Sequence, residues 1–136
     1  MFVLDASMTA SWHFKDEETD ATAAVEAMTD DQPVVVPAHW FAEIANVLWK
    51  GEWRRRATHG GTAQFIRRLQ DLMIVEDDLS SHALVERILP LARAHGLSVY
   101  DALYLELAER RGLPLASLDD KLNKAAERVG VELVRP

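Results

Sequence analysis

Short apolar runs, separated by longer stretches with a helical period, set the pattern of this chain. Residues 2–4 are wholly apolar, residues 34–36 are three valines, and residues 114–116 and 131–134 are similar short runs that follow glycines. Runs of this length without polar alternation are typical of strands buried on both faces. We therefore predict four strands at these positions, punctuated by glycine or polar residues.

Between the strands, apolar residues recur at the three- and four-residue spacing of amphipathic helices. The predicted helices cover about residues 39–55, 60–73, 83–95, 99–111 and 122–129. Pro90 is expected to bend or end the third of them, because proline lacks a backbone donor and crowds the preceding turn. Gly96 is well suited to the C-terminal cap of that helix.

Alternating strands and helices, with strands that are nearly all apolar, favour a parallel sheet covered by helices on both faces. The predicted fold class is α/β, a three-layer α/β/α domain around a central, mostly parallel sheet of four or five short strands. With 136 residues and no linker, we expect a single domain over residues 1–136.

Composition removes several classes of protein. Hydrophobic residues make up 49% of the chain and charged residues 27%, which excludes a disordered chain. Cysteine is absent, so disulfides, thiolate nucleophiles and cysteine-held metals are excluded. The longest stretch without Asp, Glu, Lys or Arg has 11 residues, 32–42, and the N-terminus does not look like a secretory signal. We expect no membrane span and a cytoplasmic location.

Two acids lie near the ends of predicted strands or at the start of the following helices. Asp5 follows the first strand, where open parallel sheets bind ligands, but it would also serve as the N-cap of a helix that begins near Ala6. Glu43 lies in an apolar helical stretch, where an unpaired charge is costly. It would equally suit a solvated helix face with Asn46 and Lys50, so both interpretations of each acid stay open.

Two further acids open later helices. Asp101 stands three residues after Ser98, the spacing of a capping box, and its position also points its carboxylate beyond the helix end. Asp119 precedes the last helix and suits an N-cap. None of the four acids has an evident Lys or Arg partner at helical spacing. Four close anions favour a divalent cation with oxygen ligands, Mg²⁺ or Mn²⁺, and hence phosphodiester hydrolysis.

The segments that carry these acids resemble the PIN domain, most closely the VapC-type toxin ribonucleases. The resemblance runs along the whole chain and rests on residues 2–7, 37–48, 97–104 and 115–119. It implies a Mg²⁺- or Mn²⁺-dependent endoribonuclease that hydrolyses structured RNA, the toxin of a type II toxin–antitoxin pair. It also implies a homodimer and a cognate antitoxin that covers the acidic pocket.

Matching positions imply roles for six residues of this chain. The metal-binding and catalytic acids would be Asp5, Glu43, Asp101 and Asp119. Two hydroxyl residues, Ser7 and Ser117, would support the network of water and ligands. Asp120 directly follows the fourth acid, where a basic or neutral residue is more usual, so the fourth assignment rests on less than the others.

Other functions remain as alternatives. A haloacid-dehalogenase-like phosphatase needs a second Asp where this chain has Ser7, and a receiver domain needs paired acids after the first strand. A degenerate PIN-like module that binds a cation or a partner without catalysis, and a PIN-type DNA or flap nuclease, stay open.

Charge and aromatic residues add two further expectations. The net charge is −7, yet residues 50–68 contain six Lys or Arg residues against one acid, a window suited to RNA phosphates. Trp49 and Trp53 lie one helical turn apart and suit a dimer interface or an antitoxin groove. The five histidines lack metal-ligand spacing, and none is assigned a catalytic role.

Overall fold

Four short parallel strands form the centre of the fold in a computed structural model that describes residues 1–135. They are β1 (Phe2–Leu4), β2 (Val34–Val36), β3 (Ile74–Glu76) and β4 (Leu115–Ala116). Their order in the sheet is β3-β2-β1-β4, so the first strand lies inside the sheet between two partners. Val3 of β1 pairs with Val35 on one side and with Leu115 on the other.

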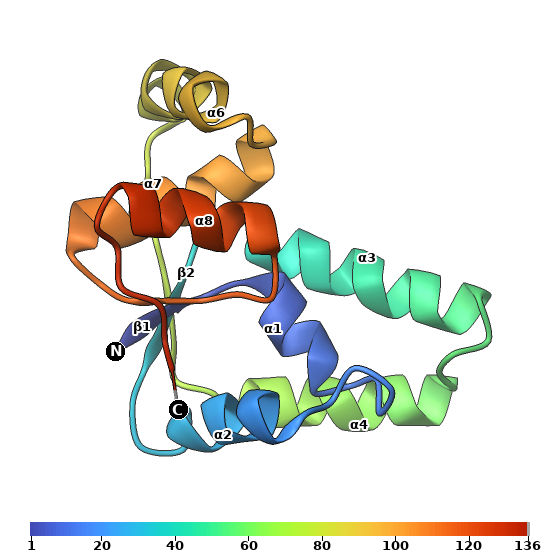
Figure 1. Cartoon of the computed structure of the whole chain (residues 1–136). Coiled ribbons are helices and arrows are strands. Elements are labelled where there is room, and N and C mark those ends of the chain that lie inside the picture. The colour runs from blue at the N-terminus through green and yellow to red at the C-terminus, as the bar shows by residue number, and fades with distance from the viewer. Residues whose placement is uncertain (136) are drawn as a thin grey trace.

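Helices flank this sheet and enclose one hydrophobic core (Figure 1). They are α1 (Ala6–Ser11), α2 (Asp20–Met28), α3 (Trp40–Trp53), α4 (His59–Gln70), α5 (Ser81–Ala83), the π-helical η1 (Leu84–Ile88), α6 (Leu89–His95), α7 (Val99–Arg111) and α8 (Asp120–Arg128). Figure 1 shows α3 and α4 extending together to one side of the molecule, joined at their far ends. No helix within residues 1–135 is long and apolar enough to cross a membrane.

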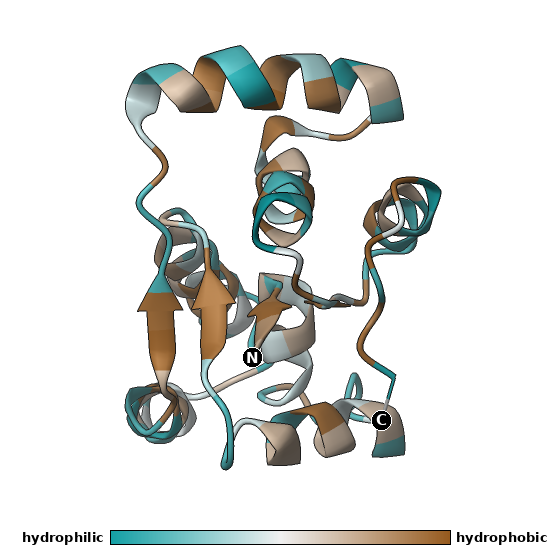
Figure 2. Cartoon of the chain, turned by 90° about the vertical axis from the view of Figure 1, so that its left-hand side faces the viewer, coloured by the Kyte–Doolittle hydropathy of each residue, from teal (hydrophilic) through white to brown (hydrophobic). Residues whose placement is uncertain are grey.

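Burial explains why the apolar runs become strands. Every residue of β1, β2 and β4 is buried, so these strands carry no polar alternation. Figure 2 shows the strands as apolar segments whose arrows point the same way. Helix α7 packs on β1 and β4 and is buried at every position from 102 to 108. This central helix therefore carries Asp101 at its start while its middle is fixed in the core.

The predicted α/β fold with a parallel sheet is confirmed, as are the strands at 2–4 and 34–36 and the strand predicted at 114–116, which the structure has at 115–116. The predicted strand at 131–134 is wrong, because only Leu133 pairs, in a single parallel bridge to Leu115. The strand β3 was not predicted, since Leu72 and Met73 extend the apolar pattern of α4 and disguise its end at Gln70. Helix α2 was also missed.

The helix that was predicted to bend or end near Pro90 changes its type of winding there instead. The helical run from Ser81 to His95 changes to a π-helical turn at residues 84–88, and α6 begins at Leu89 with Pro90 in its first turn. A π-turn before proline accommodates the missing backbone donor. Gly96 caps α6 in the left-handed conformation, with φ of 63°.

A buried ion-pair network ties the edge strand β3 to α7. Asp77 directly follows β3 and is 5% exposed. Its Oδ2 atom lies 2.5 Å from Arg110 Nη2, and its Oδ1 atom accepts hydrogen bonds from Arg111. Burial alone would raise the pKa of Asp77, but the two guanidinium groups outweigh it and hold that pKa below its ordinary value.

We expect Asp77→Asn to lower the free energy of unfolding at pH 7 by about 2 kcal/mol, because it leaves two arginines without their carboxylate. A depressed pKa stabilises the fold above the ordinary carboxyl value of 3.8 and loses that effect as pH falls through the native pKa. The difference between variant and wild type should therefore shrink in strong acid. Urea unfolding measures it, with the exposed neighbour Asp78→Asn as control. An equal loss in both variants would contradict the network's role.

Candidate active site

The parallel sheet brings the ends of three strands, and the segments that follow them, toward one edge of the fold. Asp5 directly follows β1, Glu43 lies in the first turn of α3 after β2, and Asp119 precedes α8 after β4. The carboxyl ends of parallel strands are where α/β proteins bind ligands. Topology therefore places these acids on the edge where chemistry is expected.

Asp5 is the most buried of these acids, and two serines hold it. Its side chain is 4% exposed. The Oδ2 atom accepts a hydrogen bond from Ser7 Oγ at 2.6 Å and another from Ser117 Oγ at 2.5 Å. Each serine in turn accepts a backbone N–H, Ser7 from Leu118 and Ser117 from Asp119, both at 3.0 Å. The carboxylate is thus fixed from α1 and from the loop after β4.

Asp5 occupies the N-cap position of α1, as the alternative interpretation predicted, but its side chain makes no capping hydrogen bond. Burial raises the pKa of Asp5, the hydrogen bonds from Ser117 and Ser7 oppose that rise, and the charge of Glu43 adds to it. A buried acid without a cation partner is costly, which makes Asp5 a candidate for a functional site.

Glu43 is held by two residues that sequence reasoning missed. Its Oε1 atom accepts a hydrogen bond from the Tyr104 hydroxyl at 2.6 Å and lies 2.9 Å from His39 Nε2. Glu43 is therefore not on a freely solvated helix face. Two spacings carried a signal, since His39 lies four residues before Glu43 and Tyr104 three residues after Asp101. The burial of Tyr104 raises its pKa, so it remains a hydrogen-bond donor.

Asp101 and Asp119 both lie at helix starts. Ser98 caps α7 by accepting the backbone N–H of Asp101 at 3.1 Å, as the spacing predicted. Asp119 caps α8 itself, since its Oδ1 atom accepts the Leu122 N–H at 2.7 Å. The next residue, Asp120, is exposed and lies 2.8 Å from Lys124. Asp120 is thus neutralised at the surface, whereas Asp119 is half-buried.

The four acids influence one another electrostatically. Burial raises the pKa of Asp101 despite its contact with Ser98, and the charges of Asp119 and Glu43 raise it further. None of the four has a salt bridge to Lys or Arg within residues 1–135. In that part of the chain, no three acidic or histidine side chains are already arranged to hold a metal ion. Repelling carboxylates with only oxygen donors are nevertheless the ligand set that suits Mg²⁺ or Mn²⁺.

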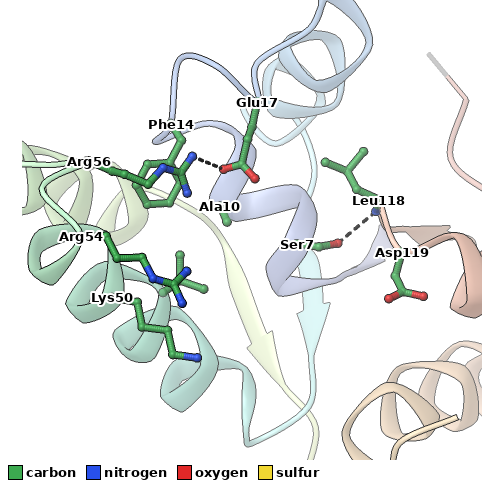
Figure 3. Close-up of a pocket in the computed structure, with 11 residues that line it drawn as sticks. Ser7, Ala10, Phe14, Glu17, Lys50, Arg54, Arg56, Leu118 and Asp119 are labelled. Atoms are coloured by element: carbon green, nitrogen blue, oxygen red, sulfur yellow. Dashed lines mark hydrogen bonds and ion pairs between the residues drawn. The ribbon is translucent and has the colours of Figure 1, made fainter.

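A cavity of about 400 Å³ reaches Asp119 and Ser7, the serine that donates to Asp5 (Figure 3). Ser7 and Asp119 line one end, and Lys50 of α3 and Arg54, the residue directly after α3, line the other. Figure 3 shows Arg56 turned toward Glu17, while Lys50 and Arg54 extend into the cavity. The space next to the acids is therefore bordered by positive charge.

Comparison with known proteins agrees with this geometry. Residues 2–128 match the PIN domain family. The chain belongs to the PIN domain family. Over 88% of this chain and 90% of the relative, it is 30% identical to Ribonuclease VapC3 of Pyrobaculum aerophilum. It is also 29% identical to Ribonuclease VapC3 of Mycobacterium tuberculosis, over 79% of this chain and 75% of that relative.

Solved structures share this PIN fold. The crystal structure of PAE2754 from Pyrobaculum aerophilum superposes with a TM-score of 0.67 at 23% identity, over 91% of this chain and 78% of that one. Mycobacterium tuberculosis VapC20, described as a Sarcin-Ricin loop cleaving toxin, superposes over the full length of both chains with a TM-score of 0.71 at 17% identity. At these identities the likeness supports the fold alone.

We expect Ser117→Ala to raise the pKa of Asp5 further in this PIN domain, because the lost hydrogen bond stabilises the ionised carboxylate. A pH titration followed by ¹³C NMR of the side-chain carboxyl measures the shift. Ser11→Ala is the matched control, since Ser11 is also buried but donates to the carbonyl oxygen of Met8. A pKa that stays constant or falls in Ser117→Ala would show that the serine does not stabilise the charge.

Proposed function

We propose that this PIN domain is a metal-dependent endoribonuclease that hydrolyses phosphodiester bonds of structured RNA. The observation that carries the proposal is the set of four carboxylates without Lys or Arg partners within residues 1–135. Among them, the charge of Glu43 helps to raise the pKa of Asp5 and, together with Asp119, that of Asp101. The ribonuclease names of the VapC relatives support the same reaction class. Asp5, Glu43, Asp101 and Asp119 would hold Mg²⁺ or Mn²⁺.

A bound divalent cation would supply a Lewis acid and a more acidic water for hydrolysis. The protein's own contribution is to fix the carboxylates before the substrate arrives. Ser7 and Ser117 orient Asp5, and Tyr104 orients Glu43. The N-terminus of α7 favours the ionised form of Asp101 through the helix dipole. Such preorganisation avoids a reorganisation cost during the reaction.

We further propose that the chain is the toxin of a toxin–antitoxin pair and binds a cognate antitoxin. The support is its membership of the PIN family together with an apolar surface on α3, where Trp49 is 59% and Trp53 is 72% exposed. Exposed tryptophans at this spacing suit burial by a partner. The homodimer and the cytoplasmic location stay predictions.

Asp101→Asn should lower the rate of RNA cleavage by about 100-fold or more, since even outer-shell partners of metal ligands contribute 10–100-fold. The measurement is cleavage of a total small-RNA pool by purified protein with Mg²⁺ or Mn²⁺, with and without chelator. Asp120→Asn is the matched control and should remain active, because Asp120 is exposed and paired with Lys124.

A folded, fully active Asp101→Asn protein would contradict the assignment of that acid. Cleavage that persists in chelator would contradict metal dependence. If folded protein binds Mn²⁺ but cleaves no RNA, the binding-module alternative is favoured, and chelator-sensitive cleavage of DNA alone favours the DNA or flap nuclease.

Tyr104→Phe should raise the Mn²⁺ concentration for half-maximal cleavage by about 10-fold, with little effect at saturating metal, because Glu43 loses the donor that orients it. Electron paramagnetic resonance of Mn²⁺ gives the affinity without reference to turnover. Tyr100→Phe is the control, since Tyr100 is 63% exposed. Equal Mn²⁺ affinity in Tyr104→Phe and wild type would show that the tyrosine does not position Glu43.

A further inference from the structure

The cavity that reaches Asp119 continues along one face of α3. Glu43, Val47 and Lys50 follow one another at spacings of four and three residues, which places them on the same side of the helix, and Arg54 is the residue directly after its end. Val47, Lys50 and Arg54 line the cavity. The face that begins at a proposed metal ligand therefore ends in two positive charges.

The distances of Lys50 and Arg54 from Glu43 along the axis of α3 can be compared with the spacing of nucleotides. At 1.5 Å per residue, Lys50 lies about 10 Å and Arg54 about 16 Å from Glu43 along the axis. Stacked nucleotides of one strand advance about 3.4 Å each. The two cations are thus separated from the acids by about three and five nucleotides of a strand that follows the cavity.

Ion pairing divides the basic window of residues 50–68 into two groups. Arg56 is bound to Asp16 and Glu17, and Arg68 is bound to Glu26. Lys50 and Arg54 have no acidic partner within residues 1–135. Among the basic residues that line the cavity, Lys50 and Arg54 have no acidic partner in the described part of the chain, whereas Arg56 has two.

Stabilisation of α3 by its helix dipole does not explain why Lys50 and Arg54 lie on the same side of the helix. Cations near a helix C-terminus offset the negative end of its dipole, whichever side of the helix they occupy. Lys50 and Arg54 instead share the side that carries Glu43. The helix dipole does not explain why both side chains line the same cavity, whereas binding of a negatively charged ligand there does.

We infer that Lys50 and Arg54 bind two backbone phosphates of the substrate strand on one side of the cleavage point. The inference rests on the proposed nuclease function and adds to it the direction in which the strand leaves the acids, along α3 toward its C-terminus. Contacts to phosphate position a strand without reading its bases. Lys50 and Arg54 therefore set affinity and register, and sequence preference arises elsewhere.

The test is binding of a labelled single-stranded RNA of about 12 nucleotides, long enough to reach both cations. Fluorescence anisotropy in chelator, over a series of salt concentrations, keeps binding separate from cleavage. For Lys50→Gln/Arg54→Gln, we expect the slope of log K against log salt to fall in magnitude by about 1.4, from two contacts of about 0.7 each. The affinity should fall by about 25-fold near 0.1 M salt.

A matched control removes the same charge elsewhere. Arg93→Gln/Arg128→Gln changes two exposed arginines that lie outside the basic window and do not line the cavity, and it should leave the slope near that of wild type. An equal effect in both double variants would mean that only net charge matters and would overturn the inference. An unchanged slope in Lys50→Gln/Arg54→Gln would do the same.

The same experiment with DNA of identical sequence separates phosphate contacts from contacts to ribose. Equal losses with RNA and DNA support binding to backbone phosphates, and a loss with RNA alone overturns it. Because chelator prevents metal-dependent cleavage, failure of the nuclease proposal appears only in the Asp101→Asn assay. If the protein binds RNA through Lys50 and Arg54 but cleaves no nucleic acid, the phosphate contacts are supported and the proposed nuclease activity is contradicted.

Discussion

A buried carboxylate without a cation partner is the constraint around which this PIN domain is arranged. Asp5 can stay in the core because Ser7 and Ser117 donate to one of its oxygen atoms. Those serines are 110 residues apart in the sequence, and each accepts a hydrogen bond from a backbone N–H of the loop after β4. Any change in that loop therefore alters the first acid as well as Asp119.

The contrast with Asp77 shows why burial of an acid does not by itself indicate function. Both acids directly follow strands of the same sheet, and both are about 5% exposed or less. Asp77 is neutralised by Arg110 and Arg111, and its pKa is held low although burial opposes this. Asp5 has no such partner within residues 1–135, and burial and the charge of Glu43 raise its pKa. One buried acid therefore joins β3 to α7, whereas the other has no cation to balance its charge.

Sequence patterns predicted the fold where burial leaves a clear signature. Strands buried on both faces are apolar throughout, so β1 and β2 were identified, but β3 is an edge strand with Glu76 exposed and an apolar start that continues the helical stripe. The acids were identifiable by position after strands and by family resemblance. His39 and Tyr104 were not, because their approach to Glu43 depends on how α3 and α7 pack.

The position of β1 between β2 and β4 also governs how the protein is made. Asp5 is synthesised 112 residues before Ser117, the serine that completes its hydrogen bonding. At a translation rate of about 5–20 residues per second, the first acid waits about 6–22 s on the ribosome for that partner. The strand that fills the sheet beside β1 arrives equally late. A nascent chain therefore cannot bring Asp5 together with Ser117 and Asp119 until β4 and the loop after it have been synthesised.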